Sequence, residues 1–153
     1  MAAVRQSGSI QGLRSPTYWI FARPFAATYS MEDLAVDHRS VAIIPTSNLD
    51  ASEAFYKRLG FDVISDYGQY RILADGRGWH LHLTHAPGWP KKIEDNPFGL
   101  YLYVEDVDAV AERVSDLIIE KGTPQAKPWG TYEFAVSDPS GLLVRIGRII
   151  DQG

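Results

Sequence analysis

The sequence predicts an α+β fold made of two copies of one module, each a strand, a helix and then about three strands. One repeat supports this: Asn48-Leu49-Asp50-Ala51 opens an apolar-periodic segment, and Asp106-Val107-Asp108-Ala109 opens another 58 positions later. A second repeat has an offset of 63, where Asp75-Gly76-Arg77-Gly78 and Asp138-Pro139-Ser140-Gly141 each precede an apolar run. Two matches in the same order indicate a duplicated half-sheet with a small insertion in the second copy. Two such copies can close around a shared cavity.

The first module spans about residues 40–85. Val41 to Ile44 is predicted to be a strand that ends at Pro45. Ser47 or Asn48 can cap the following helix, because its side-chain oxygen accepts from a free backbone amide, and Gly60 ends that helix. Three strands follow, separated by glycine-containing turns: Phe61 to Ser65, Gln69 to Ala74 and Trp79 to Thr84.

A proline-rich stretch, Ala86 to Pro97, is predicted to be the loop between the modules. In the second module, at about 98–149, Leu100 to Val104 is a strand and Val107 to Lys121 is a helix ended by Gly122. Thr123 to Pro128 holds a short strand, weakened by its prolines. The last elements form a hairpin: Tyr132 to Val136 and Leu142 to Ile149. A helix on one face of each largely antiparallel sheet leaves the other face free to line the cavity.

The composition excludes several classes of function. The 153 residues are 45% hydrophobic and 22% charged, which is ordinary for a globular protein. The net charge of -4, without a run of Lys or Arg, argues against a nucleic-acid partner. Cysteine is absent, so disulfides, thiolate metal sites and thiol nucleophiles are excluded. We expect a cytoplasmic protein with no membrane association.

Residues 1–37 differ from the rest and are expected to form an N-terminal arm or leader outside the single domain at 38–153. Tyr18-Trp19-Ile20-Phe21-Ala22 is a short apolar patch that ends at Arg23-Pro24. The patch is shorter than the core of a signal peptide. Two interpretations remain open: a poorly ordered leader, or an arm that docks on a partner subunit through Tyr18, Trp19 and Phe21.

Three motifs resemble the vicinal oxygen chelate superfamily, which contains glyoxalases, bleomycin resistance proteins and dioxygenases. Residues 49–61 resemble its first helix, and residues 101–109 resemble the start of its second module. Residues 128–136, followed by 138–147, resemble the closing hairpin of the branch that contains bleomycin resistance proteins. The resemblance covers about residues 40–149. It implies two βαβββ modules in a cupped mixed sheet with the helices on the outer face.

The superfamily contains metalloenzymes and metal-free binding proteins, which differ at four ligand positions. Here those positions are Val41, His82, Gly99 and Arg145. Only His82 has a side chain that ligates a metal, since Arg145 is a fixed cation. One imidazole does not hold a divalent ion that needs three or four protein ligands. The resemblance therefore implies a binding protein without metal or cofactor; the alternative is a lyase or dioxygenase with a shifted metal site at His80, His82 or His85.

Strand alternation places two histidines and two tyrosines on the face of the sheet away from the helices. Aromatic rings there suit a groove that stacks planar groups and offers hydrogen bonds. The candidate ligand-binding residues are His80, His82, Tyr101, Tyr103, Trp129, Glu133, Arg145 and Trp89. The two histidines are alternatively surface or core-edge residues, and Trp129 alternatively packs over the end of the sheet. An exposed Trp89 in the proline-rich loop would mark a ligand or partner contact.

Glu133 has two interpretations. It pairs with Arg145 across the hairpin if the register brings them opposite, whereas a one-residue slip places Phe134 there instead. Alternatively, its carboxylate is an anionic contact for a cationic drug. Asp138-Pro139-Ser140-Gly141 is predicted to be only a turn.

The resemblance also implies a homodimer in which module one of one subunit completes a sheet with module two of the other, so that the grooves lie at the subunit interface. Bleomycin-type antibiotics are cationic glycopeptides with a flat bithiazole. An acidic protein with an aromatic groove can stack the bithiazole and neutralise the cationic tail. Sequestration by tight binding is thus the leading hypothesis. The alternatives are the enzyme above and a binder of another small aromatic ligand.

Overall fold

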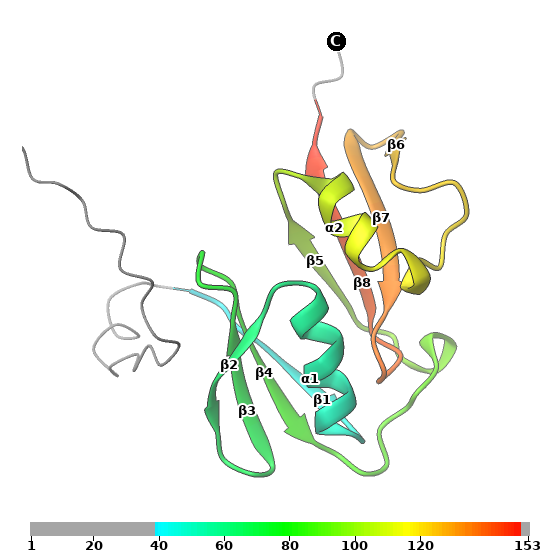
Figure 1. The fold of residues 1–153 in the computed structure, drawn as a ribbon. Coiled ribbons are helices and arrows are strands. Elements are labelled where there is room, and N and C mark those ends of the chain that lie inside the picture. The colour runs from blue at the N-terminus through cyan, green and yellow to red at the C-terminus, as the bar shows by residue number, and fades with distance from the viewer. Residues whose placement is uncertain (1–38, 151–153) are drawn as a thin grey trace, which may run out of the picture.

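Two βαβββ modules follow each other along the chain in the computed structural model, which describes residues 39–150 (Figure 1). The predicted arm at 1–37 lies outside the described residues. Module one consists of β1 (Ala42–Thr46), α1 (Leu49–Arg58), β2 (Asp62–Asp66), β3 (Tyr70–Ala74) and β4 (His80–His85). After a linker with the 3₁₀ turn Ile93–Asp95, module two consists of β5 (Gly99–Tyr103), α2 (Val107–Arg113), the 3₁₀ turn Ser115–Leu117, β6 (Gln125–Lys127), β7 (Thr131–Ser137) and β8 (Leu143–Ile149).

Each module forms its own four-stranded mixed sheet. The strand orders are β1-β4-β3-β2 and β5-β8-β7-β6, and in each sheet the first strand runs parallel to the last. Each sheet has one helix packed on one face, with α1 over the first sheet and α2 over the second (Figure 1). The α+β fold class and the two-module organisation predicted from the sequence are confirmed. None of the helices within residues 39–150 is long and apolar enough to cross a membrane.

The sequence repeat corresponds to equivalent hydrogen bonds in the two modules. Asn48 caps α1 by accepting from the backbone N–H of Ala51, and Asp106 caps α2 by accepting from that of Ala109. The Asp75 carboxylate accepts three backbone N–H groups in the turn before β4. The Asp138 carboxylate does the same for two in the turn before β8. The duplicated sequence therefore specifies the same cap and turn twice.

Alternation along the strands separates a core face from an open face in each sheet. On β4 and β8 the helix-facing residues Leu81, Leu83, Val144 and Ile146 are completely or almost completely buried. The opposite faces carry half-buried and exposed side chains, among them Ile43, which is 59% exposed. Side chains on the open faces are thus accessible to a ligand or to another subunit.

Two predicted element boundaries are wrong. Pro45 does not end the first strand but lies inside β1, which tolerates it because β1 is the edge of its sheet. The predicted helix from Val107 to Lys121 ends at Arg113. Beyond it the chain turns toward β7, where Ile118 bridges to Val136 and the Ile119 N–H donates to the Ala135 carbonyl at 3.0 Å. β-Branched residues favour this extended pairing over further helix.

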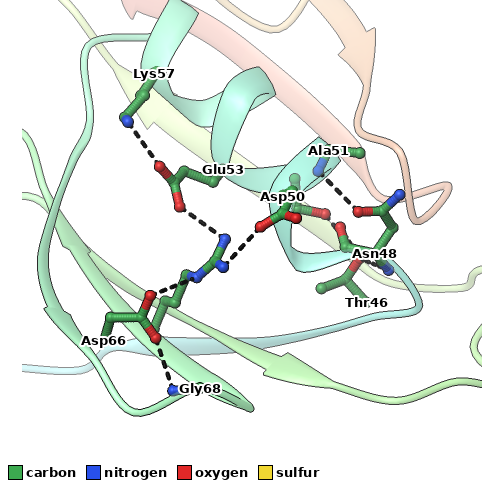
Figure 2. A network of polar contacts seen from close by, with 10 residues as sticks. Thr46, Asn48, Asp50, Ala51, Glu53, Lys57, Asp66 and Gly68 are labelled. Atoms are coloured by element: carbon green, nitrogen blue, oxygen red, sulfur yellow. Dashed lines mark hydrogen bonds and ion pairs between the residues drawn. The ribbon is translucent and has the colours of Figure 1, made fainter.

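Arg71, on β3, attaches α1 to its sheet through two carboxylates of the helix and also bonds a third carboxylate on β2. Its guanidinium bonds Asp50 at 2.7 Å, Glu53 at 2.8 Å and Asp66 at 3.2 Å. Figure 2 shows these carboxylates converging from α1 and from the β2–β3 hairpin, with Lys57 bonded to Glu53 from the next turn of α1. The cluster fixes how α1 lies across the first sheet.

Candidate functional site

The open face of the second sheet gathers five of the eight candidate residues. Register pairs Tyr101 of β5 with Arg145 of β8, and Tyr103 with Gly147, so these four positions point to the same side. Glu133 on β7 lies opposite Gly147 and shares that face. Trp129 reaches it from the turn between β6 and β7.

The hairpin register differs from both alternatives considered for Glu133. Ala135 lies opposite Arg145, while Glu133 lies opposite Gly147, two residues away. The ion pair forms nevertheless, because Arg145 reaches diagonally and its Nη1 lies 2.7 Å from Glu133 Oε1. Gly147 has no side chain, and the Glu133 side chain occupies the space above it.

The Glu133 carboxylate is completely buried although it belongs to the open face of the sheet. Its Oε2 accepts from the hydroxyls of Tyr101 at 2.8 Å and Thr131 at 2.6 Å, and more weakly from Trp129 Nε1 at 3.4 Å. Burial by itself raises the pKa of Glu133, but these donors and Arg145 outweigh it and hold that pKa below its ordinary value. Glu133 is therefore ionised and enclosed by its own donors.

A second carboxylate, Glu120, extends this cluster. It bonds Lys127 Nζ at 2.9 Å and Arg145 Nη2 at 3.0 Å, and the hydrogen bond from Lys127 lowers its pKa. Lys127 in turn lies 6.0 Å from the centre of the Trp129 ring. Sequence reasoning missed Glu120, Lys127 and Thr131. Glu120 was assigned to the overlong helix, and only the proximity of Lys127 and Thr131 to Trp129 in the sequence could have indicated the other two.

Three aromatic side chains cover this cluster, and we call Tyr101, Tyr103 and Trp129 the aromatic platform. The Tyr101 and Tyr103 rings lie 4.6 Å apart at 38°. Tyr103 is 57% exposed and Trp129 is 62% exposed, so both present apolar ring surface outward. The interpretation of Trp129 as a residue packed over the end of the sheet does not fit this exposure.

His80 and His82 lie on the open face of the first sheet, on a different module from the aromatic platform. The Tyr70 hydroxyl lies 2.6 Å from His82 Nδ1, and Arg39 Nη1 lies 3.0 Å from His80 Nδ1. Burial, followed by the charges of His80 and Arg39, lowers the pKa of His82. The two histidines are thus polar groups of an open face, hydrogen-bonded within their own module.

Trp89 is half-buried in the linker rather than exposed, contrary to expectation. The linker folds back at this point, with the Trp89 N–H donating to the Ala86 carbonyl at 2.9 Å. Its indole Nε1 is buried and has no hydrogen-bond partner among the described residues. Within residues 39–150, no hydrogen bond and no ring contact links Trp89 to the aromatic platform.

The four family ligand positions do not fit a divalent metal. Val41 and Gly99 have no donor atom, and the Arg145 guanidinium is bonded to Glu120 and Glu133. The fourth position, His82, already has Nδ1 against the Tyr70 hydroxyl. Within residues 39–150 no three His, Asp or Glu side chains are grouped closely enough to hold a metal ion.

A cavity of about 640 Å³ separates the β3–β4 turn from the β5–α2 loop. Trp79 and Arg77 line it from module one, and Tyr103, Glu105 and Arg113 line it from module two. Tyr103 is thus shared between this cavity and the aromatic platform.

Comparison with known proteins places this architecture in a family. The family model described as Glyoxalase/Bleomycin resistance protein/Dioxygenase superfamily matches residues 36–146. The chain belongs to this superfamily. No curated protein sequence matches it.

Solved structures of the superfamily share the fold. A bleomycin resistance determinant encoded on the transposon Tn5 is 25% identical, with a TM-score of 0.62, covering 74% of this chain and 98% of the other. A bleomycin-binding protein complexed with bleomycin is 23% identical, with a TM-score of 0.62, covering 73% and 98%. A glyoxalase/bleomycin resistance protein/dioxygenase from Nocardioides is 18% identical, with a TM-score of 0.60, covering 80% and 92%.

Proposed function

We propose that this superfamily member binds and sequesters a bleomycin-type antibiotic in the cytoplasm, without a metal and without chemical conversion, and thereby confers resistance. The observation that carries the proposal is the aromatic platform on the open face of the second sheet. Similar solved structures include a bleomycin-binding protein and a bleomycin resistance determinant, which supports the same class of ligand.

The platform matches the flat bithiazole of such a ligand. Exposed aromatic rings gain free energy by stacking on a planar group, and ring pairs contribute about 0.5–1.5 kcal/mol beyond the area they bury. Tyr103 and Trp129 present such rings. Arg145 cannot release its charge, and it occupies the position from which a metalloenzyme of the superfamily would supply a ligand.

We further propose that the protein acts as a homodimer in which the open face of module one of one subunit adjoins module two of the other. Within the described residues, β1 pairs only with β4 and β5 pairs only with β8, so each sheet has a free edge there. The open faces also carry exposed Ile43 and Tyr103. In this arrangement His80 and His82 line the second wall of the groove.

Isothermal titration calorimetry of the full chain with bleomycin tests the proposal. We expect binding at micromolar concentrations or tighter, and a marked loss of affinity in Trp129→Ala and Tyr103→Ala. Tyr67→Ala is the matched control, since Tyr67 is also an exposed aromatic residue but lies in the β2–β3 turn. Absence of measurable heat, or a stoichiometric divalent ion in protein purified without chelators, would contradict the proposal.

A further inference from the structure

We propose that Glu133 is a positioning residue that holds the aromatic platform in its binding shape and does not itself contact a cationic group of the ligand. This inference rests on the proposed function and names the residue that orients the rings of the site.

Glu133 joins three separate elements through one carboxylate. Its partners are Tyr101 on β5, Trp129 in the β6–β7 turn, Thr131 at the start of β7, and Arg145 on β8. Two of these, Tyr101 and Trp129, belong to the platform itself. Fixing them before the ligand arrives removes the cost of ordering rotamer-rich side chains on binding. The carboxylate thus acts on the ligand through the rings that it orients.

The same contacts, together with burial, leave Glu133 no accessible site for a ligand cation. Three side-chain donors converge on Oε2 and Arg145 takes one of the two lone-pair sites of Oε1, so a single acceptor site is left on Oε1. Its side chain is also completely buried. A cationic group of the ligand would therefore have to displace Arg145 or a hydroxyl to reach it, which leaves a buried donor unpaired.

The charge around the platform is balanced internally. Two carboxylates, Glu120 and Glu133, face two cations, Lys127 and Arg145, in one connected set of ion pairs. The net charge of this set is zero, so it offers no long-range attraction to a cation.

Glu133→Gln tests the positioning role, with Glu120→Gln as the matched control. The side-chain amide of Glu133→Gln carries two N–H donors, which would face the donors of Arg145, Tyr101 and Trp129. The four hydrogen bonds to the carboxylate therefore cannot all re-form. Glu120 belongs to the same network but contacts only Lys127 and Arg145 through its carboxylate. Two readouts are used: the ¹⁵N–¹H resonance of the Trp129 indole, assigned by its loss in Trp129→Phe, and calorimetric affinity for bleomycin.

In Glu133→Gln we expect a shifted or broadened Trp129 indole resonance and an affinity for bleomycin that is weaker by about tenfold to a hundredfold. Each tenfold loss of affinity corresponds to about 1.4 kcal/mol of binding free energy. In Glu120→Gln, which keeps all four donors on the Glu133 carboxylate, both readouts should change much less than in Glu133→Gln. An unchanged indole resonance in Glu133→Gln, or equal effects in the two variants, would overturn the inference. If Glu133→Gln does not fold, the double variant Tyr101→Phe with Thr131→Val removes two donors and must shift the same resonance.

The experiment distinguishes failure of the proposed ligand from failure of the positioning role of Glu133. If wild-type protein does not bind bleomycin while Glu133→Gln still displaces the Trp129 indole, the proposed ligand is wrong and the positioning role stands. If wild type binds bleomycin and neither readout responds to Glu133→Gln, the ligand stands and the positioning role is wrong.

Discussion

Gly147 makes room for the Glu133 carboxylate. A Cβ added to Gly147 would lie 2.6 Å from both Glu133 Cβ and Tyr101 Oη. Because that contact is far inside van der Waals distance, Gly147→Ala is expected to cost about 1–3 kcal/mol of unfolding free energy. Urea denaturation measures the change. Gly88→Ala is the control, since its Cβ meets nothing within 4 Å, and it should be neutral. Equal stability of the two variants would contradict the prediction.

Tyr101 predicts a dependence of stability on alkaline pH. Burial, and then its hydrogen bond to Glu133, raises the pKa of Tyr101 from 10.0 to about 12. The folded protein therefore holds this proton more tightly than the unfolded chain does. The stabilisation is complete below pH 10.0 and is lost as the pH rises through about 12.

Unfolding free energies of wild type and Tyr101→Phe, measured across that interval, check this prediction. The wild type should lose its advantage over the variant as the pH rises. The control Tyr67→Phe, at an exposed tyrosine, should leave the unfolding free energy close to that of the wild type. A constant difference between wild type and Tyr101→Phe would show that the tyrosine proton does not contribute.

At the scale of elements, Arg71 is predicted to stabilise the attachment of α1. Its side chain is only 14% exposed, but one partner, Asp50, is 86% exposed, so solvent weakens part of the cluster. We expect Arg71→Met to lower the unfolding free energy by about 1 kcal/mol, toward the upper end of the range for partly exposed ion pairs. The control Lys57→Met removes a single i,i+4 pair from a solvated lysine and should cost clearly less. High salt should reduce both effects; a larger effect for Lys57→Met would refute the ranking.

Element boundaries were predictable where local signals were strong. The Asn48 cap, the Gly60 stop and most strand limits agree with the sequence to within about two residues. The second helix was overestimated because Val114, Leu117 and Ile118 fit a helical period. The structure instead uses Ile118 and Ile119 to pair with β7. Periodicity alone does not distinguish these outcomes, since the partner strand is distant in sequence.

At the scale of the molecule, the two modules are joined by a buried hydrogen bond. The Tyr56 hydroxyl, on α1, donates to Asp138 Oδ2 in the β7–β8 turn at 3.1 Å. Tyr56→Phe leaves that carboxylate with one fewer donor and should cost about 1–3 kcal/mol. Tyr132→Phe removes a similar bond to exposed Asp108 within module two and should cost less. Thermal or urea unfolding that shows equal losses would contradict a special role for the junction.

The sequence by itself determined the duplicated α+β fold, the residues on each open face and the poor fit of the family positions to a metal. The fold and the open faces follow from local causes, namely strand alternation, caps and turns; the metal conclusion combines the side-chain type at each position with the four positions that the resemblance to the superfamily implies. Only the tertiary structure decided that Glu133 is buried opposite Gly147, that Arg145 reaches it diagonally, and that Glu120 and Lys127 complete the cluster. The physical reason is that hairpin register and the path of residues 114–124 depend on contacts between distant segments, which no local pattern encodes.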